Sequence, residues 1–180
     1  MFDFNAIAKE VVKNGAMQKV SELAFLLEKA QGAKVIVEIG TAKGGTLKGL
    51  CQVADENATI ISIGLPGKVF SIPKFDEENV ENIKKMARSG QKVHVINKNS
   101  HSFETKNELE ILLDGKKIDF LFIDADHTWL GVKTDWLMYA PFVKDGGIIG
   151  FHDIGKYPFH EGNFCEVDKI WNIIKNDFKY

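Results

Sequence analysis

The stretch Val35–Thr46, VIVEIGTAKGGT, decides the fold class. An apolar run typical of a buried strand ends in an acidic residue, and a glycine-rich turn then leads into a helical pattern. In open α/β sheets, ligands bind beyond the carboxyl ends of the strands, where such turns lie. Gly40 and Gly44 carry no side chains, so we interpret them as points where the backbone approaches a ligand closely. Glu38 would suit a ligand that bears an ammonium group or hydroxyl groups; the alternative is a tight turn with an acid at its edge.

The same alternation of strand and helix continues along the chain. Short apolar runs rich in Val and Ile predict buried strands at Lys34–Ile39, Thr59–Ile63, Lys92–Ile96, Asp119–Ile123 and Gly147–Phe151. Other patterns predict helices at Met17–Ala30, Thr46–Ala54, Asp76–Arg88, Glu104–Leu113, Val132–Ala140 and Cys165–Lys175. The alternation predicts an α/β fold: a doubly wound, Rossmann-like parallel sheet of at least five strands with helices on both faces. We expect one domain over residues 1–180, in which residues 1–30 form a helical segment packed on the sheet near its edge.

Composition narrows the class of function. Lys and Arg number 23 and Asp and Glu number 25, and the resulting net charge of −2 offers no general attraction for nucleic acid or an anionic membrane. The two cysteines form neither a CxxC motif nor a disulfide framework, and the N-terminus has no signal-peptide pattern, so we expect a cytoplasmic protein. The glycine spacing is not the GxGxxG of dinucleotide-binding enzymes, and no GKS or GKT sequence predicts a phosphate-binding P-loop.

Ionisable side chains follow the fourth and fifth predicted strands. Asp124, Asp126 and His127 come directly after the fourth strand, and His152 and Asp153 follow the fifth. These two strand ends are neighbours in this topology, so we expect the five side chains to converge. Clustered carboxylates repel one another unless a cation lies between them. A hard divalent ion such as Mg²⁺ would satisfy them and keep open positions for substrate oxygens; the alternative is that the acids cap the following helices.

Two other metal-dependent activities fit parts of this cluster. Asp124 and Asp126 match the short DxD pattern of metal-dependent glycosyltransferases, although those enzymes are generally larger. His127, His152 and Asp124 are the residue types of a non-haem iron site. A hydroxylase of that kind would leave the glycine-rich turn without a cofactor.

Taken together, these motifs resemble the class I S-adenosylmethionine-dependent methyltransferases. The likeness is to the small-molecule O-methyltransferases that include cephalosporin hydroxylase-like and macrolide sugar O-methyltransferase proteins. It covers Met17–Ile174 and rests on four motifs: Glu38–Thr46, Ile63–Gly67, Ile123–His127 and Gly146–Ile154. The resemblance implies methyl transfer from S-adenosylmethionine to a hydroxyl of a small acceptor molecule, assisted by a divalent metal ion.

The resemblance also implies where the cofactor lies. It would cross the glycine-rich turn, with Glu38 near its methionine end and its adenosine toward Gly64 and Asn99. The implied cofactor contacts are Glu38, Gly40, Thr41, Gly44, Gly45, Gly64, Asn99, Ser100 and Asp124.

A metal site and a general base are implied in the same way. Asp124 matches the family's first metal ligand, and His152 and Asp153 match the acidic pair that completes the site, with Mg²⁺ as the expected ion. His127 matches the position of the proposed general base. We assign Asp126, which points the other way along an extended backbone, to capping or to support of the site.

Three positions depart from the family pattern. The second strand ends in Gly64 where the family has an acid that holds the ribose hydroxyls, and Asn99 replaces a carboxylate on the adenine side. His152 stands where Glu is common, which softens the metal site and lowers its negative charge. The lost ribose contact is worth about 1.5–3 kcal/mol. The rival hypothesis is therefore a non-catalytic binding module that has lost efficient cofactor use.

The C-terminal strands also differ from the family. The family sheet normally ends in an antiparallel hairpin of two further strands, whereas Asp177–Tyr180 could begin only one of them. We therefore expect a truncated hairpin and an uncovered sheet edge, which favours pairing with another copy of the chain in a homo-oligomer.

Overall fold

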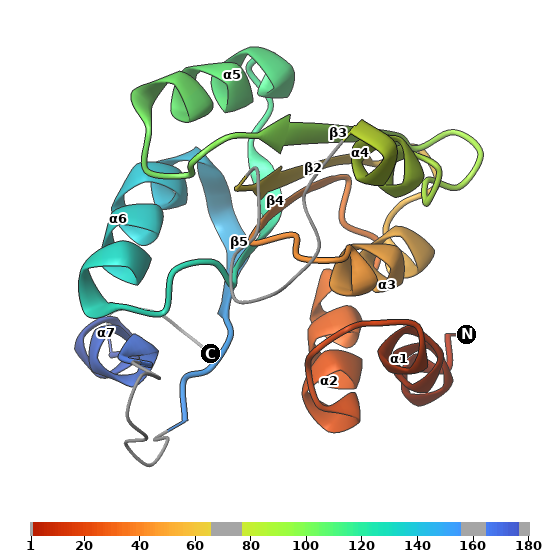
Figure 1. Ribbon diagram of the computed structural model, residues 1–180, viewed down its shortest axis with the longest axis horizontal. Helices are drawn as coiled ribbons and strands as arrows, with labels where there is room; N and C mark the ends of the chain where they lie inside the picture. Colours follow the sequence, from red (N-terminus) through yellow and green to blue (C-terminus); the bar gives the residue numbers. More distant parts are fainter. Residues whose placement is uncertain (1, 66–76, 156–164, 177–180) are drawn as a thin grey trace.

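The computed structural model describes residues 2–65, 77–155 and 165–176. Within them, the centre is a sheet of five parallel strands: β1 (Val35–Ile39), β2 (Thr59–Gly64), β3 (Lys92–Asn97), β4 (Ile118–Ile123) and β5 (Val143–Phe151). The spatial order is β3-β2-β1-β4-β5, so the strand order reverses between β1 and β4. Doubly wound sheets bind their ligands at this switch point. The predicted fold class is confirmed (Figure 1).

Helices cover both faces of the sheet (Figure 1). One layer holds α1 (Phe4–Lys13), α2 (Val20–Ala30), α3 (Gly45–Val53) and α4 (Glu77–Lys84). The other holds α5 (Phe103–Leu113), α6 (Trp129–Tyr139) and α7 (Val167–Ile174). A short 3₁₀ helix, Ala140–Phe142, joins α6 to β5. Among the described residues, no helix is both long and apolar enough to cross a membrane.

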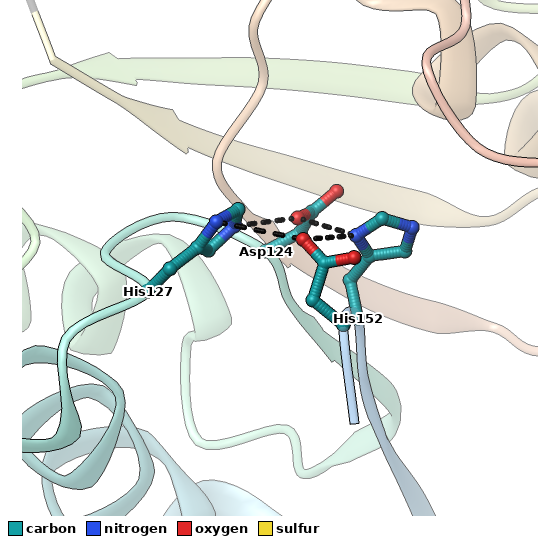
Figure 2. A group of neighbouring side chains, drawn as sticks. Asp124, His127 and His152 are labelled. Carbon is teal, nitrogen blue, oxygen red and sulfur yellow. Dashed lines mark hydrogen bonds and ion pairs between the residues drawn. The ribbon is translucent and has the colours of Figure 1, made fainter. Parts of the chain in front are cut away.

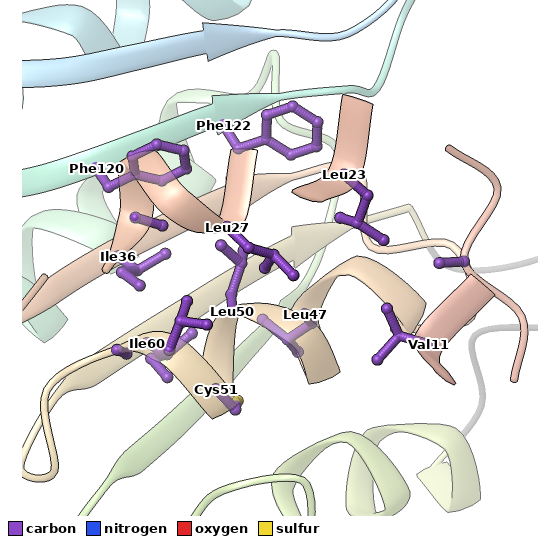
Figure 3. Close-up of a cluster of buried hydrophobic side chains, with 14 of the residues drawn as sticks. Val11, Leu23, Leu27, Ile36, Leu47, Leu50, Cys51, Ile60, Phe120 and Phe122 are labelled. Atoms are coloured by element: carbon purple, nitrogen blue, oxygen red, sulfur yellow. The ribbon is translucent and has the colours of Figure 1, made fainter. Parts of the chain in front are cut away.

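Side chains of the central strands alternate between two hydrophobic cores. Ile36, Ile60 and Phe120 face the α1–α3 layer, where they pack with leucines such as Leu27 and Leu50 (Figure 3). The neighbouring strand residues turn to the other layer; they include Val37, Ile39, Ile61, Ile63, Leu121 and Ile123. Because helices cover both faces of the sheet, every residue of β1 and β2 is buried. In β4, every residue but one is buried. Fully burying one such aliphatic or aromatic side chain is worth about 1.5–3 kcal/mol.

The N-terminal segment forms two helices where the sequence predicted one. The Asp3 side chain caps α1 by accepting a hydrogen bond of 2.9 Å from the Ala6 backbone N–H. The second helix begins at Val20 instead of Met17. Residues 14–19 form the link between them, and this link lies against the glycine-rich turn at Gly45.

Two further element boundaries differ from the sequence prediction. Strand β5 begins at Val143, four residues before the predicted start, and its pairing with β4 shifts register between Ile118 and Phe120. Helix α4 ends at Lys84, not at Arg88, and the Arg88 side chain donates hydrogen bonds to the Cys51 and Ala54 carbonyls at the end of α3. The start of the predicted helix at position 76, and the predicted partial hairpin at 177–180, lie outside the described residues.

Candidate active site

The carboxyl ends of β1, β4 and β5 meet at one edge of the sheet. The backbone N–H of Asp124 donates to the Ile39 carbonyl at 2.8 Å, which ties the end of β4 to the end of β1. The backbone N–H of His152 donates to the Ile123 carbonyl at 3.1 Å, which ties β5 to β4. Residues that directly follow these strands are therefore held side by side.

Four of the five side chains that were predicted to converge do so (Figure 2). His127 Nε2 lies 3.3 Å from Asp124 Oδ1, and His127 Nδ1 lies 3.5 Å from Asp153 Oδ2. His152 Nδ1 lies 3.3 Å from Asp124 Oδ1 and 3.2 Å from Asp153 Oδ2. One candidate ligand atom from each of the four residues lies within 4.8 Å of the others. The fifth, Asp126, instead accepts a hydrogen bond from the Thr128 backbone N–H, while Thr128 itself caps α6.

Burial and mutual attraction set the protonation of this cluster. Burial opposes ionisation of Asp124, but hydrogen bonds from His127 and His152 hold the pKa of this carboxyl below its ordinary value. Asp124 in turn raises the pKa of His127. Burial would lower the pKa of His152, but the carboxylates of Asp124 and Asp153 outweigh it and raise this pKa to about 10. The cluster thus brings two imidazole rings and two carboxyl groups together at one edge of the sheet.

A second network reaches the cluster from the N-terminal segment. The Gln18 side chain is buried; its Nε2 donates to Asp124 Oδ2 at 2.7 Å, and its Oε1 accepts from Thr46 Oγ1 at 2.7 Å. Sequence reasoning missed Gln18, because no local pattern marks a residue whose partner is 106 positions away. The link between α1 and α2 is therefore part of the wall of the site.

Glu38 lies fully buried in β1 and belongs to a polar chain. The hydroxyl of Ser62, its partner in β2, donates to Glu38 Oε2 at 3.0 Å, and Thr41 Oγ1 hydrogen-bonds Ser62 Oγ in turn. Within the described part of the chain, Glu38 Oε1 is buried without a hydrogen-bond partner. Burial, with a smaller contribution from Asp124, raises the pKa of Glu38 to about 8.

Residues 37–154 match a protein-family model described as a methyltransferase domain, over more than half of the chain. The chain belongs to this methyltransferase family. The resemblance to class I methyltransferases inferred from the sequence is thus confirmed.

One curated protein and several solved structures are similar to this methyltransferase-family chain. An uncharacterized protein of Acanthamoeba polyphaga mimivirus is 34% identical over 136 residues, which cover 74% of this chain and 58% of that protein. An O-methyltransferase from Bacillus cereus, solved in complex with SAH, superposes with a TM-score of 0.57 at 18% identity, over 80% of this chain and 64% of that one.

Two further solved structures have the same fold. A putative caffeoyl-CoA O-methyltransferase from Staphylococcus aureus gives a TM-score of 0.57 at 17% identity, over 86% of this chain and 68% of that one. The O-methyltransferase TomG from Streptomyces achromogenes, in complex with SAM, gives a TM-score of 0.53 at 13% identity, over 86% of this chain and 66% of that one. This chain therefore spans about three fifths to two thirds of the proteins it matches.

Two glycines of the methyltransferase-family turn lie very close to the backbone of other segments of the chain. Gly40 has a φ of +101°, and a Cβ at this position would lie 2.0 Å from the Asp124 carbonyl oxygen. A Cβ on Gly45 would lie 2.3 Å from the Ala16 backbone nitrogen. Gly44 adopts a left-handed conformation, at a φ of +76°, at the start of α3. A side chain at Gly40 or Gly45 would therefore collide with the backbone of the chain itself.

The predicted adenosine side of the site is described in part. Gly64 is buried at the end of β2. The exposed Asn99 accepts a hydrogen bond from the His101 backbone N–H at 2.9 Å, which closes a turn after β3. Ser100 is buried, and its carbonyl accepts a hydrogen bond from the Tyr139 hydroxyl. Residues 66–76, which follow β2, lie outside the described residues.

Proposed function

We propose that this protein transfers a methyl group from S-adenosylmethionine to a hydroxyl of a small acceptor molecule. The observation that carries the proposal is the position of Glu38, buried between the glycine-rich turn and the Asp/His cluster at the switch point of the sheet. Family membership supports the reaction class. Because the chain spans only part of its relatives, the activity of the whole protein belongs to this proposal.

The residues around Glu38 fit the methionine end of the cofactor. Within the described residues, its Oε1 is a buried acceptor without a hydrogen-bond partner, so it suits a ligand donor such as an ammonium group. An ammonium placed there would favour the ionised carboxylate and offset the cost of burying it. The structures from B. cereus and S. achromogenes, which were solved with SAH and SAM, share the fold that positions this carboxylate.

The remaining predicted contacts define the path of the cofactor. We assign its central part to the turn that contains Gly40, Thr41, Gly44 and Gly45. Its adenosine extends toward the ends of β2 and β3 at Gly64, Asn99 and Ser100, and Asp124 borders it on the β4 side. The S-adenosylmethionine sulfonium supplies the methyl group: its C–S bond breaks as a C–O bond forms, and SAH leaves.

The cluster provides the second half of the site. We assign Asp124, His152 and Asp153 to a divalent metal ion, which would lower the pKa of a bound hydroxyl. The sequence predicts Mg²⁺ as this ion. His127 then takes the proton, because its ring faces both carboxylates while its side chain keeps 36% of its surface exposed. The chain mainly holds the reacting groups in line and accepts one proton.

A second candidate function rests on the adenosine side. Strand β2 ends in Gly64, which offers no carboxylate to the ribose, and the Asn99 side-chain oxygen is already engaged by the turn after β3. These two features favour a methyltransferase-like binding module with weak cofactor affinity. Measurement of turnover separates this module from the enzyme.

The test is transfer of label from methyl-labelled S-adenosylmethionine to a panel of catechols, sugars and polyols in the presence of divalent ions. We expect label in at least one hydroxylated compound, and loss of this activity in Asp124→Asn. Asp126→Asn is the matched control, because Asp126 lies outside the cluster, and it should keep the activity. Failure of every acceptor while the cofactor still binds would favour the binding module.

A further inference from the structure

We propose that the Asp124–His152–Asp153 site selects a first-row transition-metal ion, such as Mn²⁺, Fe²⁺, Co²⁺ or Zn²⁺, over Mg²⁺. This inference deepens the proposed function and rests on it for the location of the metal. Three observations carry it: the spacing of the donor atoms, their chemical type, and the surroundings of the His152 ring.

The donor atoms are spaced as ligands of one ion are. His152 Nδ1 lies 3.3 Å from Asp124 Oδ1 and 3.2 Å from Asp153 Oδ2. Charge-assisted N–H···O hydrogen bonds are shorter, at about 2.7–2.9 Å. Four-coordinate ions with bonds of about 2.0–2.1 Å place neighbouring donor atoms roughly 3.3–3.4 Å apart. His152 Nδ1 is buried and faces both carboxylate oxygens at these longer distances.

The donor types favour a transition metal. Mg²⁺ demands oxygen ligands in near-octahedral geometry and dehydrates reluctantly, whereas imidazole suits Zn²⁺, Fe²⁺ and other first-row transition ions. The site offers one imidazole nitrogen from His152 and a carboxylate oxygen from each of Asp124 and Asp153. Two carboxylates can neutralise a divalent ion. A site with a third carboxylate in place of His152 would carry more negative charge and attract Mg²⁺ more strongly.

The surroundings of the ring fix which nitrogen faces the ion. Nδ1 of His152 points into the cluster (Figure 2). Its Nε2 lies 4.0 Å from Glu22 Oε2 on α2. Metal-bound histidines commonly direct their second ring N–H toward a carboxylate, which fixes the tautomer and strengthens the ligand. Gln18 plays the corresponding part for Asp124, since it binds Oδ2 and leaves Oδ1 toward the histidines.

The test measures metal binding directly, on chelator-treated protein without S-adenosylmethionine. Co²⁺ is titrated by its visible absorption, Mn²⁺ by loss of the free-ion electron paramagnetic resonance signal, and Mg²⁺ by calorimetry and by competition against Mn²⁺. We expect Mn²⁺ and Co²⁺ to bind at least about 10-fold more tightly than Mg²⁺. Equal or tighter binding of Mg²⁺ would overturn the proposal, as would failure of every ion to bind.

Two variants make the result specific to His152. His152→Glu supplies a third carboxylate, so we expect the preference for Co²⁺ over Mg²⁺ to shrink or reverse. His94→Glu, at a half-buried histidine of β3 outside the cluster, should leave the preference unchanged. An unchanged preference in a folded His152→Glu protein would also overturn the proposal. Cofactor binding is measured separately: Co²⁺ binding without S-adenosylmethionine binding would refute the proposed function and leave the metal assignment standing.

Discussion

Gln18 and Asp124 are joined by a 2.7 Å hydrogen bond that connects the N-terminal segment to the end of β4. The amide orientation is fixed from the other side, because Thr46 Oγ1 donates to Gln18 Oε1 at 2.7 Å. One Asp124 oxygen is thereby held by the protein, and the other is directed to the two histidines. The link between the two N-terminal helices is therefore part of the site, while the helices themselves cover the sheet.

Replacing Gln18 should weaken the metal site more than it weakens the fold. Gln18→Leu keeps the approximate size of the side chain but releases Asp124, and we expect Co²⁺ affinity to fall about 10-fold, the lower end of effects for residues that orient ligands. Because Thr46 and Asp124 each lose a hydrogen-bond partner, the free energy of unfolding measured with denaturant should fall by about 1–3 kcal/mol. Gln31→Leu, after the end of α2, is the matched control. Unchanged Co²⁺ affinity in Gln18→Leu would refute this role.

The role of His127 can be separated from that of the metal ligands. If His127 is the general base, His127→Ala should lower the rate of methyl transfer by about 10²-fold or more while Co²⁺ still binds. Asp124→Asn should instead lose the metal and with it the metal dependence of the reaction. Paired measurements of turnover and Co²⁺ affinity decide the matter. Loss of Co²⁺ affinity in His127→Ala would make His127 a ligand, contrary to our assignment.

The sequence predicted the sheet and the Asp/His cluster because both rest on short-range patterns. Apolar runs mark buried parallel strands, and ionisable residues just after Ile123 and Phe151 must lie at the same edge. Gln18 could not be predicted, since its contact depends on where the link between α1 and α2 lies relative to the end of β4. Ser62 could not either, because a serine in an apolar strand becomes informative only once its register with Glu38 is known. The close contact of Gly40 with the backbone of Asp124 could not be predicted either, because it joins segments far apart in the sequence.

Glu38 should make the stability of the protein depend on pH. Burial raises its pKa from 4.5 to about 8, so the folded protein holds a proton that the unfolded chain has already lost in this window. Unfolding releases that proton, and stability falls as pH rises from about 4.5 to about 8. Glu38→Gln has no carboxyl group to ionise here, so this fall in stability should disappear. The Tm of Glu38→Gln should exceed that of the parent near pH 8.5 and roughly equal it near pH 4.5. Thermal melts at both pH values check this, and a Tm difference that does not change with pH would contradict it.

Gly40 should be required for folding itself. In Gly40→Ala, the new Cβ would meet the Asp124 carbonyl at 2.0 Å, and neither backbone segment can yield easily. We expect a loss of about 3 kcal/mol or more in denaturant unfolding. Gly32→Ala is the control: its φ of +72° is also positive, but no atom lies within 4 Å of the added Cβ. Gly32→Ala should lower the free energy of unfolding by only about 1–2 kcal/mol. Equal decreases in Gly40→Ala and Gly32→Ala would show that the contact with Asp124 does not affect stability.

Calorimetric titration of the folded protein with S-adenosylmethionine tests the central claim most directly. If the edge around Glu38 is a cofactor site, the parent should bind with a Kd below about 100 μM, or roughly −5.5 kcal/mol. Glu38→Gln, which loses the carboxylate for the ammonium group, should bind about 10-fold or more weakly, since a hydrogen bond to a charged group is worth about 1.5–3 kcal/mol. Absence of binding by the folded parent at millimolar cofactor, or equal affinity of parent and Glu38→Gln, would contradict the account.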